Sequence, residues 1–145
     1  DTTFARLREQ GKRAFIPFLT VGDPDLGATL DRAASLVAAG ADVIELGFPY
    51  SDPIADGPVI QSSYTRALAR RLTLDDIFRT AASIHAAHPG TPLVAMTSFS
   101  LVWRRGMEWF LGQARTAGFS GLIVPDLPLE ESAILREPAQ AHGLH

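Results

Sequence analysis

The sequence predicts an α/β fold built on a parallel sheet. Four apolar segments of strand length alternate along the chain with amphipathic segments of helical length. Each apolar segment runs into a stretch rich in turn-forming residues, after which a helical pattern follows. Strands joined in this way pair in parallel through right-handed crossovers. The alternation leaves open a doubly wound sheet or part of a closed barrel, and both bind ligands at the carboxyl ends of their strands.

The predicted strands are short apolar runs that end at turn residues. Within the first of them, Pro17 restricts pairing because proline has no backbone N–H to donate. The second run alternates faces, so that Ile44 and Leu46 point one way while Val43 and Glu45 point the other. The four strands are expected at residues 14–21, 42–46, 92–97 and 121–124.

The predicted helices carry apolar residues at spacings of three and four. The second has a stripe formed by Leu30, Ala33, Ala34 and Val37. A later helix opens with Thr73 and Asp76 in the spacing of a capping box. Proline at position 138 predicts a kink or an early end in the last helix. The helices are expected at residues 3–10, 26–39, 60–69, 73–88, 107–117 and from about 130 onward.

Length and composition describe one ordinary globular domain over residues 1–145. The net charge of −3 gives no basic surface for nucleic acid, and no run approaches the ~20 apolar residues of a membrane span. The chain has no cysteine, which excludes disulfides, thiolate metal sites and a cysteine nucleophile and fits a cytoplasmic protein. Its start lacks a signal peptide's apolar region. Because the chain begins without Met, we expect it to be trimmed.

Two carboxylates eleven residues apart are the first candidates for chemistry. Glu45 ends the second strand on the face opposite Ile44 and Leu46, where apolar surroundings would raise its pKa toward neutrality. The alternative is a structural ion pair with an arginine from another strand. Asp56 lies in the long Gly- and Pro-rich loop that follows, and taken alone its Asp-Gly pair is an ordinary turn signal.

Other polar residues carry weaker signals. Asp23 and Asp126 each follow a strand and are expected to cap the next helix or form an Asx turn, although they could also face a partner. His85 and His88 lie on one helix without clustered carboxylates, so we predict no metal site. Neither familiar Gly-rich phosphate loop is present.

Three ordered blocks resemble the tryptophan synthase α subunit family. The most specific block is Glu45-Leu46-Gly47-Phe48-Pro49-Tyr50-Ser51-Asp52-Pro53-Ile54-Ala55-Asp56-Gly57. It is preceded by Phe15-Ile16-Pro17-Phe18-Leu19-Thr20-Val21-Gly22-Asp23-Pro24 and followed by Pro125-Asp126-Leu127-Pro128-Leu129-Glu130-Glu131-Ser132. The resemblance covers nearly the whole chain but only the first part of the family's length.

This resemblance implies a (β/α)₈ TIM barrel of which about the first four β/α units are present. The family cleaves indole-3-glycerol phosphate by a retro-aldol reaction to indole and glyceraldehyde 3-phosphate. By resemblance, Glu45 is the general acid/base that protonates the indole ring carbon, and Asp56 binds the indole N–H as positive charge develops. Phe18 and Ile123 are then expected to form walls of the indole pocket.

The resemblance also implies a partner. The family passes indole to a tryptophan synthase β subunit, which alone carries pyridoxal phosphate, so no cofactor is expected in this chain. The residues that match partner-facing loop positions are Asp52, Pro53, Asp126 and Pro128.

Two departures from the family pattern affect these expectations. Ser98 stands where the family has a tyrosine that lines the substrate pocket, so by resemblance Ser98 is expected to line it here. Ser100 stands where the family has an asparagine. Strands five to eight are missing, together with the Gly-rich loops that hold the substrate phosphate.

Four interpretations therefore stay open. The chain is the amino-terminal part of an active α subunit, or of a free-standing indole-3-glycerol phosphate lyase that needs no β subunit. Alternatively it is a non-catalytic half-barrel that associates through its open sheet edges or binds the β subunit. The last interpretation is an inactive fragment.

Overall fold

A four-stranded parallel sheet forms the centre of the molecule in the computed structural model, which describes residues 2–145. Neighbouring strands follow chain order, and every pair is parallel. The strands are β1 Phe18–Thr20, β2 Ile44–Gly47, β3 Leu93–Met96 and β4 Phe119–Ile123.

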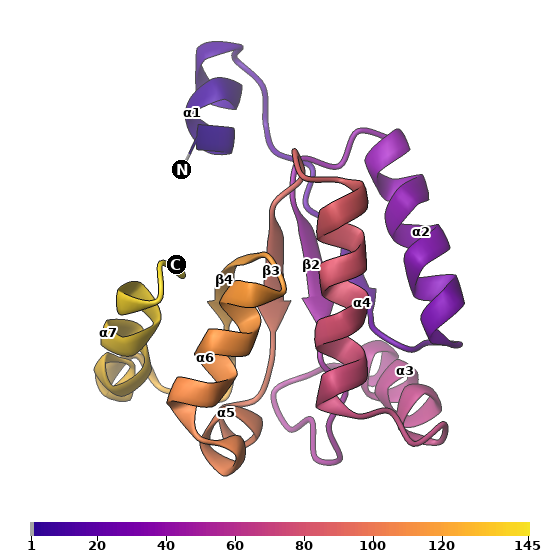
Figure 1. Cartoon of the computed structure of the whole chain (residues 1–145), viewed down its shortest axis with the longest axis vertical. Coiled ribbons are helices and arrows are strands. Elements are labelled where there is room, and N and C mark those ends of the chain that lie inside the picture. The colour runs from indigo at the N-terminus through magenta and orange to yellow at the C-terminus, as the bar shows by residue number, and fades with distance from the viewer. Residues whose placement is uncertain (1) are drawn as a thin grey trace.

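Helices cover one face of this sheet. In Figure 1, α2, α4 and α6 lie side by side over the strands, and α2 contacts α4 while α4 contacts α6. The helices are α1 Thr2–Glu9, α2 Leu26–Ala38, α3 Pro58–Leu68, α4 Leu74–Ala87, α5 Phe99–Arg105, α6 Met107–Thr116 and α7 Ala133–Ala141, with a 3₁₀ turn, η1, at Leu129–Glu131. A doubly wound sheet reverses its strand order and carries helices on both faces. Here the strands follow chain order and the helices cover one face, as in part of a β/α barrel.

The core lies between the sheet and these helices. Ile44 and Leu46 are 0 % exposed, as the alternation along this strand predicts for its helix-covered face. Phe48 stands at the centre of an aromatic group, with ring centroids 5.5 Å from Phe78, 5.9 Å from Phe110 and 5.7 Å from Phe119. This packing holds the carboxyl end of β2 against α4 and α6.

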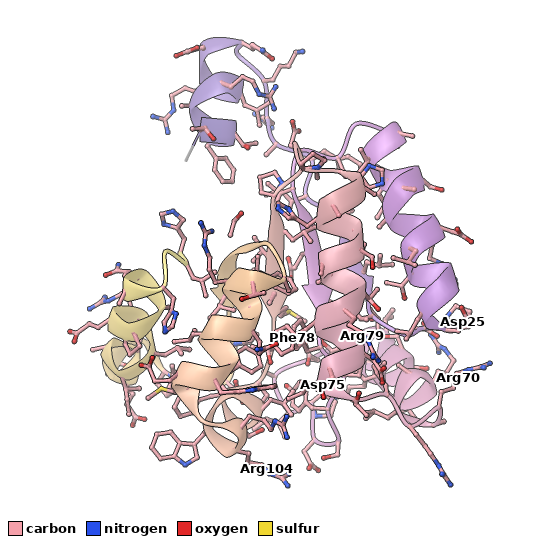
Figure 2. All side chains as sticks on the ribbon, in the orientation of Figure 1. Asp25, Arg70, Asp75, Phe78, Arg79 and Arg104 are labelled. Carbon is pink, nitrogen blue, oxygen red and sulfur yellow. The ribbon has the colours of Figure 1, made fainter. Side chains whose placement is uncertain are left out.

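The predicted capping box begins α4. The Thr73 hydroxyl accepts from the Asp76 backbone N–H at 3.2 Å, and the Asp76 carboxylate accepts from the Thr73 N–H at 3.1 Å. Figure 2 shows the resulting amphipathic register: Phe78 packs in the core, while its neighbour Arg79 is exposed. The prediction for this helix is therefore confirmed, including its apolar face.

Three local predictions were wrong. In α2, Leu30 and Ala34 are exposed, because the buried stripe instead runs through Thr29 and Ala33. A separate helix, α5, occupies the segment after β3 that we expected to be loop. The early end predicted at Pro138 as the alternative to a kink does not occur, because the last helix continues to Ala141.

The first strand is shorter than predicted because regular pairing starts only after Pro17. The carbonyl of Pro17 still accepts from the Glu45 N–H at 2.9 Å, so the chain approaches the sheet before β1 begins. At the other edge, the His145 N–H donates to Ser120 O at 3.0 Å and the Leu122 N–H donates to His145 O at 2.8 Å. This pair of bonds is the pattern of a parallel ladder next to β4.

Asp23 has a different role from the predicted cap. Its carboxylate receives two hydrogen bonds from Arg66, from Nε at 2.9 Å and from Nη2 at 2.7 Å. The cap of α2 is Asp25, which accepts from the Ala28 N–H at 2.8 Å. The ion pair joins the turn after β1 to α3, and the Arg66 guanidinium lowers the pKa of Asp23.

Candidate active site

Glu45 lies on the open face of the sheet. Because side chains alternate along β2, it points away from the helix layer and lines a cavity of about 550 Å³ with Val43, Val94 and Ile123. Burial raises the pKa of Glu45 above its ordinary value. Within residues 2–145, no arginine or lysine forms an ion pair with it. Its geometry therefore matches a proton-exchanging carboxyl better than a structural ion pair.

Phe18 and Ile123 lie on the same face as Glu45. Phe18 is the register partner of Glu45 across β1 and β2, and its ring extends over Gly47. Ile123 is 40 % exposed at the end of β4 and lines the Glu45 cavity. Two apolar side chains, one on the neighbouring strand β1 and one on β4, therefore share the face of the sheet that carries the carboxyl group.

Asp56 is held in a turn just before α3. Its N–H donates to Pro53 O at 3.1 Å, and its carbonyl accepts from the Gln61 side chain at 2.8 Å. The Tyr50 hydroxyl donates to its carboxylate at 3.3 Å. Burial raises the pKa of Asp56, the hydrogen bond from Tyr50 lowers it, and the charge of Asp126 raises it further. The net effect raises the pKa of Asp56, so the folded protein disfavours the charged form of this carboxyl group.

Asp126 organises the loop after β3. Its carboxylate accepts from the Ser98 hydroxyl at 2.6 Å and from the Phe99 N–H at 2.9 Å. The Ser98 and Ser100 hydroxyls are 2.7 Å apart. Asp126 therefore supports the start of α5, whose N-cap residue is Ser98. Of the two roles predicted for Asp126, a cap of the following helix or an Asx turn, the cap was wrong.

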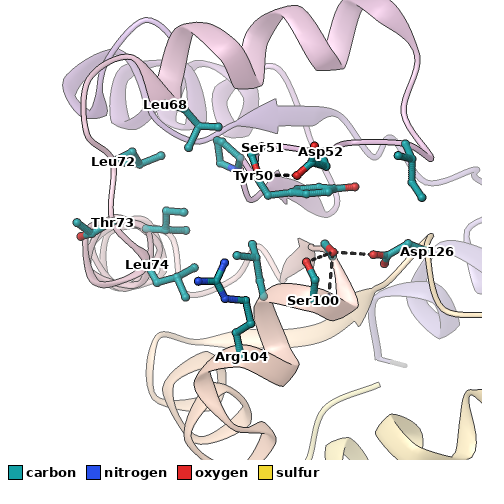
Figure 3. Close-up of a pocket in the computed structure, with 15 residues that line it drawn as sticks. Tyr50, Ser51, Asp52, Leu68, Leu72, Thr73, Leu74, Ser100, Arg104 and Asp126 are labelled. Atoms are coloured by element: carbon teal, nitrogen blue, oxygen red, sulfur yellow. Dashed lines mark hydrogen bonds between the residues drawn. The ribbon is translucent and has the colours of Figure 1, made fainter.

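A second hollow, which Ser98, Ser100 and Asp126 help to line, lies at the carboxyl end of the sheet. It has a volume of about 580 Å³ and is lined by Tyr50, Asp52, Ser98, Arg104 and Asp126, among others (Figure 3). Ser98, which we predicted to line the substrate pocket, faces this hollow and is only 1 % exposed. The structure thus separates Ser98 from the cavity that Glu45 and Ile123 share.

The four residues expected to face a partner lie on two loops at this end. Asp52 and Pro128 are exposed, whereas Pro53 and Asp126 are partly buried. Asp52 and Asp126 line the same hollow, which brings the loop after β2 close to the loop after β4. The structure therefore unites residues more than seventy positions apart on one surface.

Tyr50 and Tyr64 are site residues that the sequence analysis missed. Burial and the neighbouring carboxylates Asp56 and Asp126 raise the pKa of Tyr50 to about 12. Tyr64 on α3 is 1 % exposed, and its ring centroid is 5.7 Å from that of Tyr50. The available signal was the position of Tyr64 four residues after Ile60, on the side of α3 that meets the sheet.

Two other kinds of site were sought along residues 2–145. No group of three or more His, Asp or Glu side chains has an arrangement that could hold a metal ion. Over the same residues, every helix is too short or too polar to cross a membrane.

The chain matches the protein family described as "Tryptophan synthase alpha chain" over residues 4–145. It is 50 % identical over 141 residues to the tryptophan synthase alpha chain of Microcystis aeruginosa, covering 97 % of this chain and 53 % of that protein. The protein of the same name from Burkholderia multivorans is 46 % identical over 142 residues, which are 98 % of this chain and 52 % of the relative. This chain therefore spans about half the length of the curated relatives it matches.

Solved structures give the same picture. Tryptophan synthase subunit alpha from Legionella pneumophila superposes with a TM-score of 0.97 at 38 % identity, covering 100 % of this chain and 55 % of that one. A chain from the tryptophan synthase α2β2 complex of Pyrococcus furiosus gives a TM-score of 0.85 at 38 % identity, covering 90 % and 52 %.

Proposed function

Because this chain belongs to the tryptophan synthase alpha chain family, we propose that it is the amino-terminal part of a lyase that cleaves indole-3-glycerol phosphate. The products are indole and glyceraldehyde 3-phosphate, formed in tryptophan biosynthesis. The predicted fold class is confirmed: the chain is the first four β/α units of a (β/α)₈ barrel.

The observation that carries the proposal is the setting of Glu45. Within residues 2–145, this carboxyl of raised pKa has no arginine or lysine partner, and it lines a cavity on the face of the sheet that also carries Phe18 and Ile123. Protonation of an indole ring carbon requires an acid of this kind, held next to an apolar surface that binds the flat ring. The open face of β2 supplies both.

In the proposed reaction, Glu45 protonates the ring carbon that bears the glycerol side chain. The ring becomes a cationic indolenine. The adjacent hydroxyl then gives its proton to the Glu45 carboxylate and becomes the aldehyde, while the electrons of the breaking bond return to the ring and restore neutral indole. Asp56 accepts from the indole N–H and stabilises the positive charge. Phe18 and Ile123 flank the ring. This chain's residues therefore act on the indole end of the substrate.

We further propose a β subunit as partner. The support is the exposed carboxyl-end surface that carries Asp52, Pro53, Asp126 and Pro128, and the similarity to a chain of an α2β2 complex. Pyridoxal phosphate belongs to that partner in the proposal, and this chain itself uses no cofactor. A biosynthetic role of this kind places the protein in the cytoplasm.

The test is indole release from indole-3-glycerol phosphate by the purified chain, with its 15.6 kDa mass verified, alone and with a β subunit. Glu45→Gln is expected to lower the rate by about 100- to 10,000-fold while the fold is retained, because general acid catalysis is lost. Glu137→Gln, an exposed change on α7, is the matched control and keeps the parent rate.

The outcomes separate the alternatives. Indole that disappears only in Glu45→Gln supports the enzyme. A folded chain of the correct mass that releases none under either condition contradicts activity for this chain and favours a non-catalytic half-barrel. Equal activity with and without the β subunit favours a free-standing lyase.

A further inference from the structure

Tyr64 presents a hydroxyl group that the proposed reaction does not use. The side chain is 1 % exposed, and among residues 2–145 its hydroxyl has no hydrogen-bond partner. Buried polar groups in folded proteins are almost always bonded, so an isolated buried donor points to a missing acceptor. The position of the hydroxyl identifies where that acceptor belongs.

The Tyr64 hydroxyl lies at the open face of β2. It is 3.0 Å from the point that a Cβ on Gly47 would occupy, beside the ring of Phe18. Gly47 is two residues after Glu45, so both lie on the same face of the strand. The phenol of α3 therefore reaches the candidate site because position 47 has no side chain.

Asp56 is the acceptor that the surroundings favour. The charge of Asp56 raises the pKa of Tyr64 more than that of Glu45 does. Tyr50, whose ring packs against Tyr64, already donates to Oδ2 of Asp56 at 3.3 Å. Within residues 2–145, no side chain or backbone N–H donates to Oδ1 of Asp56, so one oxygen is available.

We propose that Tyr64 is a positioning residue whose hydroxyl donates a second hydrogen bond to the carboxylate of Asp56. Tyr50 and Tyr64 then hold this group between two phenols, one from the loop and one from α3. Forming the bond requires a shift of the loop before α3, where Ile54 is 86 % exposed and adds no core packing. The hydrogen bond itself does not depend on catalysis. Only its role in orienting Asp56 toward an indole N–H rests on the proposed function.

Two hydrogen bonds would stabilise the charged form of Asp56 at this site. Burial and the charge of Asp126 both disfavour the Asp56 anion, and a single bond from Tyr50 opposes them. A second donor stabilises the charged form that is needed to face an indole N–H. It also fixes the direction of the free lone pairs.

The chain is suited to a direct test because it contains only two tyrosines. Tyrosine labelled with carbon-13 at Cζ gives one signal for Tyr50 and one for Tyr64, assigned with Tyr50→Phe and Tyr64→Phe. Both signals are followed in the ligand-free chain across the pH range in which carboxyl groups ionise. The carboxyl groups whose charges act on Tyr64 are Asp56 and Glu45, and the charge of Asp126 acts on Asp56.

The Tyr64 signal is expected to shift with the ionisation of Asp56. The shift disappears in Asp56→Asn and persists in Glu45→Gln. In Tyr64→Phe, the Tyr50 signal still reports the ionisation of Asp56, and its midpoint rises by about one pH unit, because the anion loses one hydrogen bond. Phenylalanine keeps the ring, and the remaining spectrum reports whether the fold is intact.

Two results would overturn the proposal. One is an Asp56 midpoint that is the same in the parent and in Tyr64→Phe. The other is a Tyr64 signal that follows Glu45, or that titrates with neither carboxyl, which assigns the hydroxyl to Glu45 or to a buried water. The Asp56→Asn variant keeps Tyr64, so its Tyr64 signal tests the proposed hydrogen bond even if Tyr64→Phe folds poorly.

Failure here and failure of the proposed function are distinguishable. Loss of the coupling in a chain that releases indole contradicts only the role of Tyr64. An intact coupling in a chain that releases no indole contradicts only the proposed reaction.

Discussion

The ring of Phe18 lies against the open face of Gly47, where any other residue would carry its side chain. A Cβ at position 47 would stand 2.7 Å from Cε2 of Phe18 and 3.0 Å from the Tyr64 hydroxyl. This close approach brings a side chain of β1 and one of α3 together over β2. The glycine therefore sets the shape of the candidate site without contributing a functional group.

Gly47→Ala is expected to destabilise the fold by about 1–3 kcal/mol, because the added methyl group displaces a packed ring. Gly112→Ala makes the same chemical change in the interior of α6, where a Cβ meets nothing within 4 Å. That variant is expected to gain about 0.5–1 kcal/mol from helix propensity. Urea unfolding of the two proteins measures both, and similar values for the pair would refute the packing argument.

Asp56→Asn is expected to make the chain more stable than the parent at neutral pH. The folded state raises the pKa of Asp56 above its ordinary 3.8, so folding favours the protonated form. The parent therefore loses stability as the pH rises from 3.8 through the raised pKa, and the variant does not. Unfolding free energies measured across this range should show the gap closing toward acid pH.

Asp23→Asn is expected to show the opposite dependence. Arg66 lowers the pKa of Asp23 below its ordinary 3.8, so the parent gains stability above 3.8 and loses it as the pH falls through the lowered value. The variant should be less stable than the parent at neutral pH and equal to it in acid. Asp31→Asn, an exposed change on α2, is the control. If Asp31→Asn loses as much stability at neutral pH as Asp23→Asn, the ion pair with Arg66 is not the cause.

Thr73→Ala is expected to cost about 1 kcal/mol, because the first turn of α4 loses the side-chain acceptor of its capping box. Ser83→Ala removes a hydroxyl from the middle of the same helix, where it bonds only the Arg79 carbonyl. This control should be neutral or slightly stabilising. Thermal or urea unfolding checks the pair, and an unchanged Thr73→Ala would show that the box is dispensable.

Local patterns predicted much of the fold because their physical causes lie within a few residues. The capping box of α4 is an exchange of bonds between Thr73 and Asp76, three positions apart. The two faces of β2 follow from strand geometry, which places Glu45 opposite Ile44 and Leu46. Predictions of elements were wrong where contacts between residues distant in the chain set the local structure. Helix α5 begins where Asp126, from the loop after β4, accepts from the Phe99 N–H.

Patterns within the sequence were enough to predict the strand and helix alternation, the family resemblance, and the face of β2 on which Glu45 lies. Those features depend on periodicity and on motifs that are contiguous in the chain. Only the tertiary structure decided that Arg66 pairs with Asp23 and that Ser98 turns toward Asp126. It alone placed the Tyr64 hydroxyl over Gly47. Each of these contacts joins elements that only folding of the sheet and its helices brings within reach.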